Sequence, residues 1–156
     1  MDPLDFYGLA KELRTKSSNY PEALKRTIVC RFYYAIFLMV RDELNVALKG
    51  SQAEPLYSSI SQMGAIHTCV MDALSKIERD RHLSNVLHGM RRRRDTADYQ
   101  TQTLRKLNWD NEIDDIVSMA DEVLQNRPKL QPSFSQKLFE IETLVTFWHS
   151  KVAASP

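Results

Sequence analysis

The sequence has little glycine, only two cysteines and almost no net charge. Four scattered glycines among 156 residues argue against a strand-rich fold with many tight turns and against a glycine-rich phosphate loop. A net charge of +1 means that any basic site must be local. HExxH, CxxC and nucleophile-elbow motifs are absent from the sequence, and no histidine spacing suits a metal. We therefore expect neither a metal nor another cofactor.

Long hydrophobic runs are also missing. The most apolar run, residues 32–40, is too short to span a bilayer and lies between Arg31 and Arg41. Cys30 and Cys69 lie in apolar helical patterns, as small buried hydrophobes do in a reducing compartment. The first residues show no signal-peptide pattern. We therefore expect a cytoplasmic protein with no membrane contact.

Helical periodicity is what the sequence has in abundance. A hydrophobic fraction of 43% with 26% charged residues is typical of a globular protein, and we expect a single domain over residues 1–156. Apolar residues recur at helical spacing along almost the whole chain. The expected helices are 3–16, 21–48, 60–77, 78–99 (a fourth helix or a kinked continuation of the third) and 108–127, with an extra C-terminal helix at about 133–152. This order predicts an all-α fold, an up-and-down bundle of five to six helices.

Helix breakers set several of the expected boundaries. A polar connection containing Pro55 is expected over residues 51–57, and residues 100–108 are expected to leave the helix. Proline has no N–H to donate to a helix, so Pro128 is expected to end the fifth helix. Ser133 then begins a capping box that starts the last one.

The densest polar segment runs from Met90 to Tyr99. Four consecutive arginines there meet two aspartates, and Arg91–Asp95 and Arg94–Asp98 have the four-residue spacing of ion pairs on a helix. Two such pairs on a charged face are the plain structural interpretation. However, four adjacent cations repel one another. Arg94 also continues an apolar stripe, so it needs a buried partner, either Asp98 or a group from another helix or subunit.

Two short motifs resemble those of a known superfamily. The segment Cys30-Arg31-Phe32-Tyr33-Tyr34-Ala35-Ile36-Phe37 resembles the "SRxYYAxF" helix of HEPN-domain proteins. Arg94-Asp95-Thr96-Ala97-Asp98-Tyr99 resembles the "RxxADY" segment of an uncharacterised prokaryotic branch, and His67 on the third helix fits the same pattern. The resemblance covers roughly residues 3–127. It implies a HEPN-like bundle that forms a homodimer, with the arginine-rich helix facing its twin across a cleft.

The resemblance also implies a chemistry. Many HEPN proteins are metal-independent endoribonucleases, acting as toxins beside a nucleotidyltransferase-type antitoxin or in phage defence. Their active site is an arginine followed, four to six residues later, by a histidine. Histidine moves the proton of the attacking 2′-hydroxyl, and arginine stabilises the charge on the phosphorane. Here Arg93 occupies the arginine position, but the residue five positions later is Asp98. His88, one turn before Arg92, is an alternative source of the proton-transfer group.

Two main hypotheses follow. In the first, the protein is an RNA-directed ribonuclease or toxin component, with Arg93 and Arg94 on phosphate and Asp98 or His88 in proton transfer. Its RNA- or phosphate-binding residues would be Arg91, Arg92 and Tyr99. In the second, the chain is a non-catalytic HEPN dimerisation or adaptor module that binds a partner protein, a nucleotide or RNA. A plain helical bundle with only generic likeness to HEPN proteins is a third possibility. Whether the protein is an enzyme depends on which of these holds.

Overall fold

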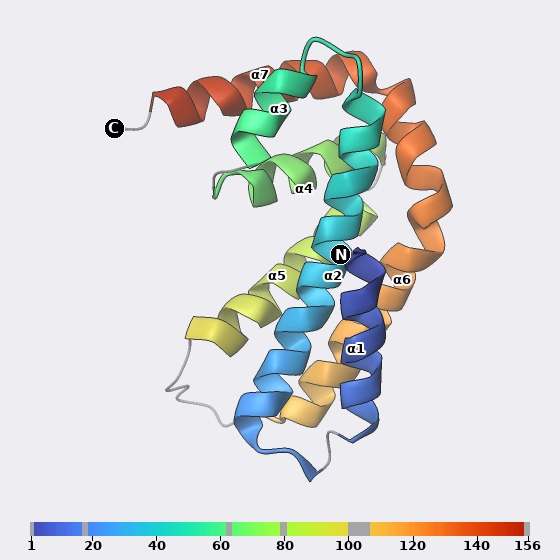
Figure 1. Ribbon diagram of the computed structural model, residues 1–156, viewed down its shortest axis with the longest axis vertical. Coiled ribbons are helices and arrows are strands. Elements are labelled where there is room, and N and C mark those ends of the chain that lie inside the picture. The colour runs from blue at the N-terminus through green and yellow to red at the C-terminus, as the bar shows by residue number, and fades with distance from the viewer. Residues whose placement is uncertain (1, 17–18, 62–63, 79–80, 100–106, 155–156) are drawn as a thin grey trace. The chain divides into compact units, whose positions relative to one another are not determined.

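The computed structural model describes residues 2–16, 19–61, 64–78, 81–99 and 107–154. Within these ranges the chain forms seven α-helices and no β-strand (Figure 1). The helices are α1 (Pro3–Thr15), α2 (Glu22–Leu48), α3 (Glu54–Ser61), α4 (Ile66–Ile77), α5 (His82–Tyr99), α6 (Trp109–Gln136) and α7 (Leu138–Ala153). The expected all-α class is confirmed for this part of the chain, with seven helices rather than five or six. None of the described helices has the length and hydropathy needed to cross a bilayer.

Local signals set several helix ends. The Asp2 side chain accepts a hydrogen bond of 2.9 Å from the Leu4 N–H, and Pro3 is the first residue of α1. Helix α2 ends just before Gly50, whose φ of 80° is the left-handed conformation that glycine adopts easily. The Asn108 side chain accepts from the Asp110 N–H at 3.1 Å and so caps α6. Most of the expected non-helical segment 100–108 lies outside the described residues.

The segment after α2 differs from the expectation of a polar connection followed by one long helix. Residues 54–77 contain two helices, α3 and α4, with Gly64 and Ala65 in the turn before α4. Pro55 lies in the first turn of α3, where a backbone N–H would have no acceptor within the helix, so it does not prevent the helix from starting there. The Glu54 carboxylate accepts from the Gly50 N–H at 2.7 Å and ties this start to the end of α2.

The prediction that Pro128 ends the fifth helix is wrong. Helix α6 continues through Pro128 and Pro132 to Gln136, and the C-terminal helix begins at Leu138 rather than near residue 133. Proline within a helix costs about 3 kcal/mol relative to alanine. Leu130 and Phe134, which follow Pro128 on α6, are buried to 1% and 0% exposure, and their burial offsets that cost.

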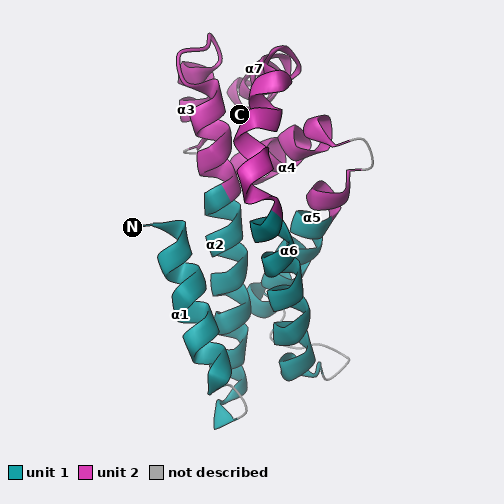
Figure 2. Ribbon diagram, turned by 90° about the vertical axis from the view of Figure 1, so that its right-hand side faces the viewer, with its two compact units in different colours: residues 1–39, 86–125 teal, residues 40–85, 126–156 magenta. Residues whose placement is uncertain are grey.

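The chain divides into two compact units (Figure 2). Unit 1 consists of residues 1–39 and 86–125, and unit 2 of residues 40–85 and 126–156. Each has its own buried side chains; unit 1 buries Ile28, Phe32, Leu87, Met90, Ile113 and Ile116, and unit 2 buries Leu44, Leu48, Tyr57, Met71, Leu74, Phe134 and Val145. In unit 2, α7 packs against α3 and α4. The single domain expected over residues 1–156 stays a prediction.

Candidate functional site

Helix α5 carries the arginine run along the edge of the unit 1 core. Met90 and Ala97 are buried, with exposures of 0% and 4%. Arg94 lies between them on the same stripe, and only 16% of its side chain is exposed. The inference that Arg94 extends an apolar stripe and needs a partner is therefore confirmed.

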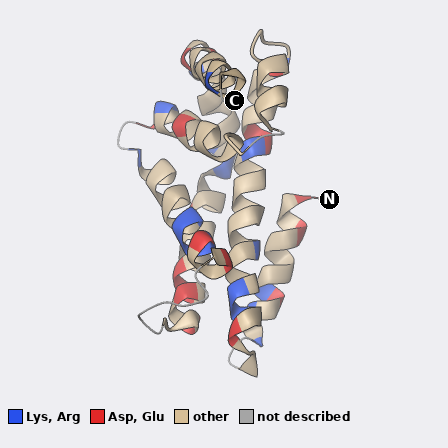
Figure 3. Cartoon of the chain, turned by 90° about the vertical axis from the view of Figure 1, so that its left-hand side faces the viewer, with Lys and Arg blue, Asp and Glu red and all other residues tan. Residues whose placement is uncertain are grey.

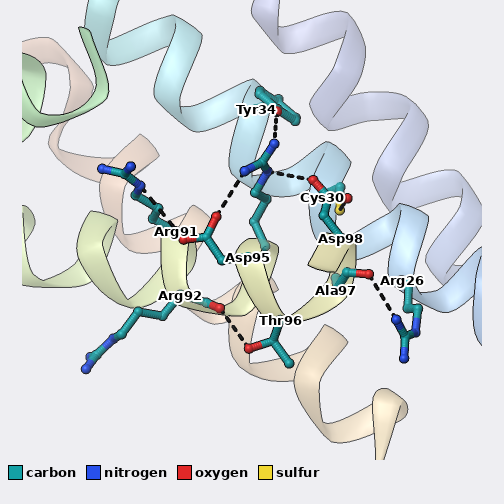
Figure 4. Close-up of polar contacts among 10 residues, drawn as sticks. Arg26, Cys30, Tyr34, Arg91, Arg92, Asp95, Thr96, Ala97 and Asp98 are labelled. Carbon is teal, nitrogen blue, oxygen red and sulfur yellow. Dashed lines mark hydrogen bonds and ion pairs between the residues drawn. The ribbon is translucent and has the colours of Figure 1, made fainter. Parts of the chain in front are cut away.

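The Arg94 guanidinium contacts several groups of α2 and α5, among them Tyr34, Asp95 and Asp98, which are labelled in Figure 4. One terminal nitrogen donates to Asp95 Oδ1 at 2.9 Å and the other to the Tyr34 hydroxyl at 2.5 Å. Nε lies 2.8 Å from Asp98 Oδ2 and forms an ion pair with it. Among the described residues, the Nε–H of Arg94 makes no hydrogen bond. The rings of Tyr34 and Tyr99 lie 5.2 and 5.1 Å from the guanidinium carbon. We call these five residues the Arg94 cluster.

The electrostatics of the Arg94 cluster keep the arginine charged. Burial alone would lower the pKa of Arg94, because it disfavours the charged form. The hydrogen bond to Asp95 and the negative charge of Asp98 act in the opposite direction, and the net effect raises the pKa. The cation is thus compensated inside the protein rather than left available to an incoming phosphate.

Asp98 is also bonded to α2. The Cys30 Sγ–H donates to Asp98 Oδ1 at 2.9 Å, while Asp98 Oδ2 faces Arg94. Burial, and after it the hydrogen bond to Asp98, raises the pKa of the Cys30 thiol to about 12. Cys30 is therefore protonated at neutral pH and is not an activated nucleophile. Both carboxylate oxygens of Asp98 are therefore already engaged.

A cleft of about 430 Å³ lies beside the Arg94 cluster, between α2 and the last turns of α5. Its lining residues are Ala23, Arg26, Thr27, Cys30, Arg31, Tyr34, Ala97 and Asp98. Arg26 donates to the Ala97 carbonyl at 3.2 Å and pairs with Glu22 at 2.8 Å, and Arg31 lies over the Phe6 ring at 5.4 Å. Sequence reasoning missed Arg26, Arg31 and Cys30 as site residues. The four-residue spacing of Arg26, Cys30 and Tyr34, which places them on one face of α2, was the available signal.

Arg93 points to a different neighbour from Arg94. Its Nε lies 3.2 Å from Glu112 Oε2, and a terminal nitrogen donates to Asp115 Oδ2 at 2.7 Å; both carboxylates belong to α6. Only 24% of the Arg93 side chain is exposed. The structure therefore does not bring the two arginines of the predicted catalytic set together. Arg93 links α5 to α6, and Arg94 links α5 to α2.

The remaining predicted residues share the outer face of α5. His88 and Arg92 are exposed and lie one turn apart, and the Tyr99 side chain is 69% exposed. Arg91 lies 3.9 Å from Asp95 Oδ2 with 35% of its side chain exposed, and Arg92 extends away from the Arg94 cluster (Figure 4). We call His88, Arg91, Arg92 and Tyr99 the outer α5 face. His67 of the same resemblance belongs to α4, in unit 2.

Charges on the unit 1 helices are grouped by sign. The unit 1 part of α6, residues 109–125, has six acidic residues and no Lys or Arg, whereas the arginine run of α5 is basic. Blue and red segments therefore both appear on the unit 1 ribbon (Figure 3). Among the described residues, no group of three or more histidine, cysteine or acidic side chains is arranged to hold a metal ion. The arginine run of α5 therefore lies next to acidic residues of α6, which offset part of its charge.

Comparisons with known proteins identify a relative whose own activity is unknown. No model of a protein family matches the chain, and no solved structure matches it. The chain is 30% identical over 108 residues to an uncharacterized protein of Methanocaldococcus jannaschii, a match that covers 65% of this chain and 65% of that protein. The chain thus spans slightly less than two thirds of the length of this relative.

Proposed function

We propose that this chain is a HEPN-like, non-catalytic binding module that takes single-stranded RNA on the outer α5 face. The observation that carries the proposal is that the Arg94 guanidinium is already engaged by groups within the protein. It is engaged by Asp95, Asp98 and Tyr34, and its carbon lies 5.2 and 5.1 Å from the ring centroids of Tyr34 and Tyr99. An arginine with this many internal partners serves assembly, because a substrate phosphate would first have to displace a carboxylate.

Two further observations weigh against ribonuclease chemistry at the expected position. Arg93 is held by Glu112 and Asp115, so it does not converge with Arg94 on one phosphate. Asp98 accepts from the Cys30 thiol and faces the Arg94 cation, so neither of its oxygens is poised to take a proton from a ribose hydroxyl.

The outer α5 face has the groups that an RNA single strand requires. Arg91 and Arg92 supply cations for phosphates, and the exposed Tyr99 ring supplies a stacking surface for a base. The Arg94 guanidinium carbon lies 5.1 Å from the centroid of the Tyr99 ring, and this contact holds the ring in place. The homodimer that the HEPN resemblance implies and the cytoplasmic location expected from the sequence stay predictions, and a nucleotidyltransferase-type antitoxin belongs to the ribonuclease alternative below.

RNA binding can be tested by fluorescence anisotropy with a labelled single-stranded RNA over a range of salt concentrations. The Arg91→Ala, Arg92→Ala variant should bind more weakly and lower the salt slope by roughly 0.7 for each phosphate that the protein no longer neutralises. Lys129→Ala is the matched control, since it removes an exposed cation from α6 within unit 2. Equal affinity and equal salt slope for the wild type and the double variant would refute the proposal.

A second candidate is a metal-independent ribonuclease that uses His88 in place of the missing histidine. It is favoured by one observation: His88 and Arg92 are both exposed one turn apart on α5. In the presence of a chelator, this candidate requires RNA cleavage that is lost in His88→Ala and retained in Arg93→Ala, Arg94→Ala. We expect no cleavage by any of these proteins.

A further inference from the structure

The outer surface of α7 in unit 2 has features that the proposed function does not use. Ile141 and Val145 are buried against unit 2, with exposures of 1% and 0%. On the opposite side of the helix, Phe139 is 81% exposed and Phe147 is 49% exposed. Between and after them, at spacings of three and four residues, lie Thr143, Thr146 and Ser150. We call these five outward residues the α7 stripe; none of them is charged.

Covering the α7 stripe with a partner costs little desolvation free energy. The Thr143 hydroxyl donates to the Phe139 carbonyl at 3.0 Å, that of Thr146 to the Glu142 carbonyl at 2.9 Å, and that of Ser150 to the Thr146 carbonyl at 3.0 Å. Each hydroxyl proton is therefore used within the helix, and the threonine methyl groups add to the apolar surface. A partner surface would not leave these donors unpaired.

The aromatic end of the stripe is already ordered. Phe147 makes an edge contact with Trp148 at 5.6 Å, and Lys151 lies over the Phe147 ring at 5.4 Å. Trp148 in turn donates from its indole N–H to Asp72 of α4 at 2.9 Å. A side chain held in this way loses little conformational entropy when a partner covers it. A hollow of about 400 Å³ lies beside the stripe; its lining residues are Gln52, Ala53, Leu56, Phe139, Glu142, Thr143 and Thr146.

The charges beside the stripe indicate which partner fits. Glu140 and Lys151 lie on the same flank of α7, eleven residues apart, or about 16 Å along the axis. Glu140 bonds Lys137 through Oε1 at 2.8 Å, and its side chain remains 48% exposed. When two copies of such a helix pair antiparallel, residues on one flank meet the same flank of the other helix in reverse order. Each Glu140 then faces the partner's Lys151, whereas a parallel two-fold pair would place this flank against the opposite flank of the partner helix, which carries Glu142.

We propose that the α7 stripe docks against the α7 stripe of a second copy of this chain, antiparallel, about a two-fold axis close to Val145 and Thr146. The contact is isologous, so one apolar surface and two identical ion pairs are buried at once. It is a different surface from the α2 and α5 region, and it does not depend on RNA binding.

The first test is molar mass by sedimentation or light scattering over a concentration series of the full chain. The wild type should associate, and Phe147→Glu and Phe139→Glu should each weaken that association by about tenfold or more. Phe147→Leu is the size-matched control and should retain most of it. A wild type that never associates through the series, or association unchanged in both glutamate variants, would overturn the proposal.

The second test addresses orientation. Glu140→Lys and Lys151→Glu should each weaken association, and the combination of the two should restore it, since the swapped charges again face each other. Thr146→Cys, near the axis, should form an oxidised dimer that the wild type does not form under the same conditions. Ser150→Cys, further along the helix, should not form one. No recovery in the double swap, or equal cross-linking at both positions, would exclude the antiparallel arrangement.

Discussion

Arg94 illustrates how a cation is accommodated at the edge of an apolar core. Its aliphatic stem continues the stripe of Met90, and its charged end reaches two carboxylates and a tyrosine hydroxyl. Asp98 has a second use, since it accepts the Cys30 thiol proton. Removal of Arg94 would therefore take from Asp98 its paired cation and leave Asp95 with Arg91, 3.9 Å away.

The Arg94→Ala variant should lower the free energy of unfolding by about 2 kcal/mol, because Asp95 loses a hydrogen-bond donor and Asp98 loses the cation of its ion pair. Arg94→Lys should lower it by about half as much, since the charge remains but the planar fork is lost. Both values are measurable by urea denaturation. Arg92→Ala, which removes an exposed arginine next to the cluster, should change stability by less than about 0.5 kcal/mol. Equal losses at positions 92 and 94 would contradict the structural role of the Arg94 cluster.

Helix α5 has three different sides, two of which link it to neighbouring helices. On one side, Arg93 donates a hydrogen bond to a carboxylate of α6, and on another, Arg94 donates to the Tyr34 hydroxyl of α2. A third side, with His88 and Arg92, is exposed. Gly89 lies on the α6 side, where a methyl group added at its Cα would come within 3.2 Å of the terminal methyl of Met119.

Gly89→Ala tests this packing on α5. Alanine is favoured over glycine within a helix by about 1 kcal/mol, and the end of the Met119 side chain can turn aside. We expect the free energy of unfolding to rise, but by less than about 1 kcal/mol, in thermal or urea denaturation. Gly89→Leu should lower it, because the larger side chain must displace Met119. A stabilising leucine would show that α5 and α6 are not packed closely at this point.

At the scale of the whole molecule, buried thiols and phenols link stability to alkaline pH. Burial raises the pKa of Cys69 to about 12, and burial followed by Asp98 does the same for Cys30. Burial also raises the pKa of Tyr33 and of Tyr57. A group whose pKa is higher in the folded state holds its proton more tightly there. The stability that these groups contribute is therefore complete below the unfolded pKa and is lost as pH rises towards the folded value.

For the thiols the decline in stability should begin near the ordinary value of 9.0 and continue towards about 12. At about pH 10, a thiol with such a shift has lost roughly 1.4 kcal/mol of its contribution. Urea denaturation between neutral pH and about pH 10 measures the slope. The Cys30→Ala, Cys69→Ala variant should start less stable but decline less steeply, and an unchanged slope would contradict the assignment.

The features that could be predicted from the sequence are those with local causes. Asp2 and Pro3 start α1, Gly50 stops α2 and Asn108 caps α6, because each acts on backbone groups within a few residues. The Arg94–Asp98 pair is of the same kind, since residues four apart on a helix are neighbours whatever surrounds them. The amphipathic stripe that holds Arg94 at the core edge also follows from periodicity alone.

What only the tertiary structure decided are the partners that are distant in sequence. Tyr34 is 60 residues from Arg94, Cys30 is 68 from Asp98, and Asp115 is 22 from Arg93. Which of two adjacent arginines faces α2 and which faces α6 depends on where those helices pack, and no local pattern encodes that. The continuation of α6 past Pro128 has the same origin, because burial of Leu130 and Phe134 outweighs a local preference to stop. Local energies set where helices start and pair within themselves, and packing between helices determines what their side chains can do.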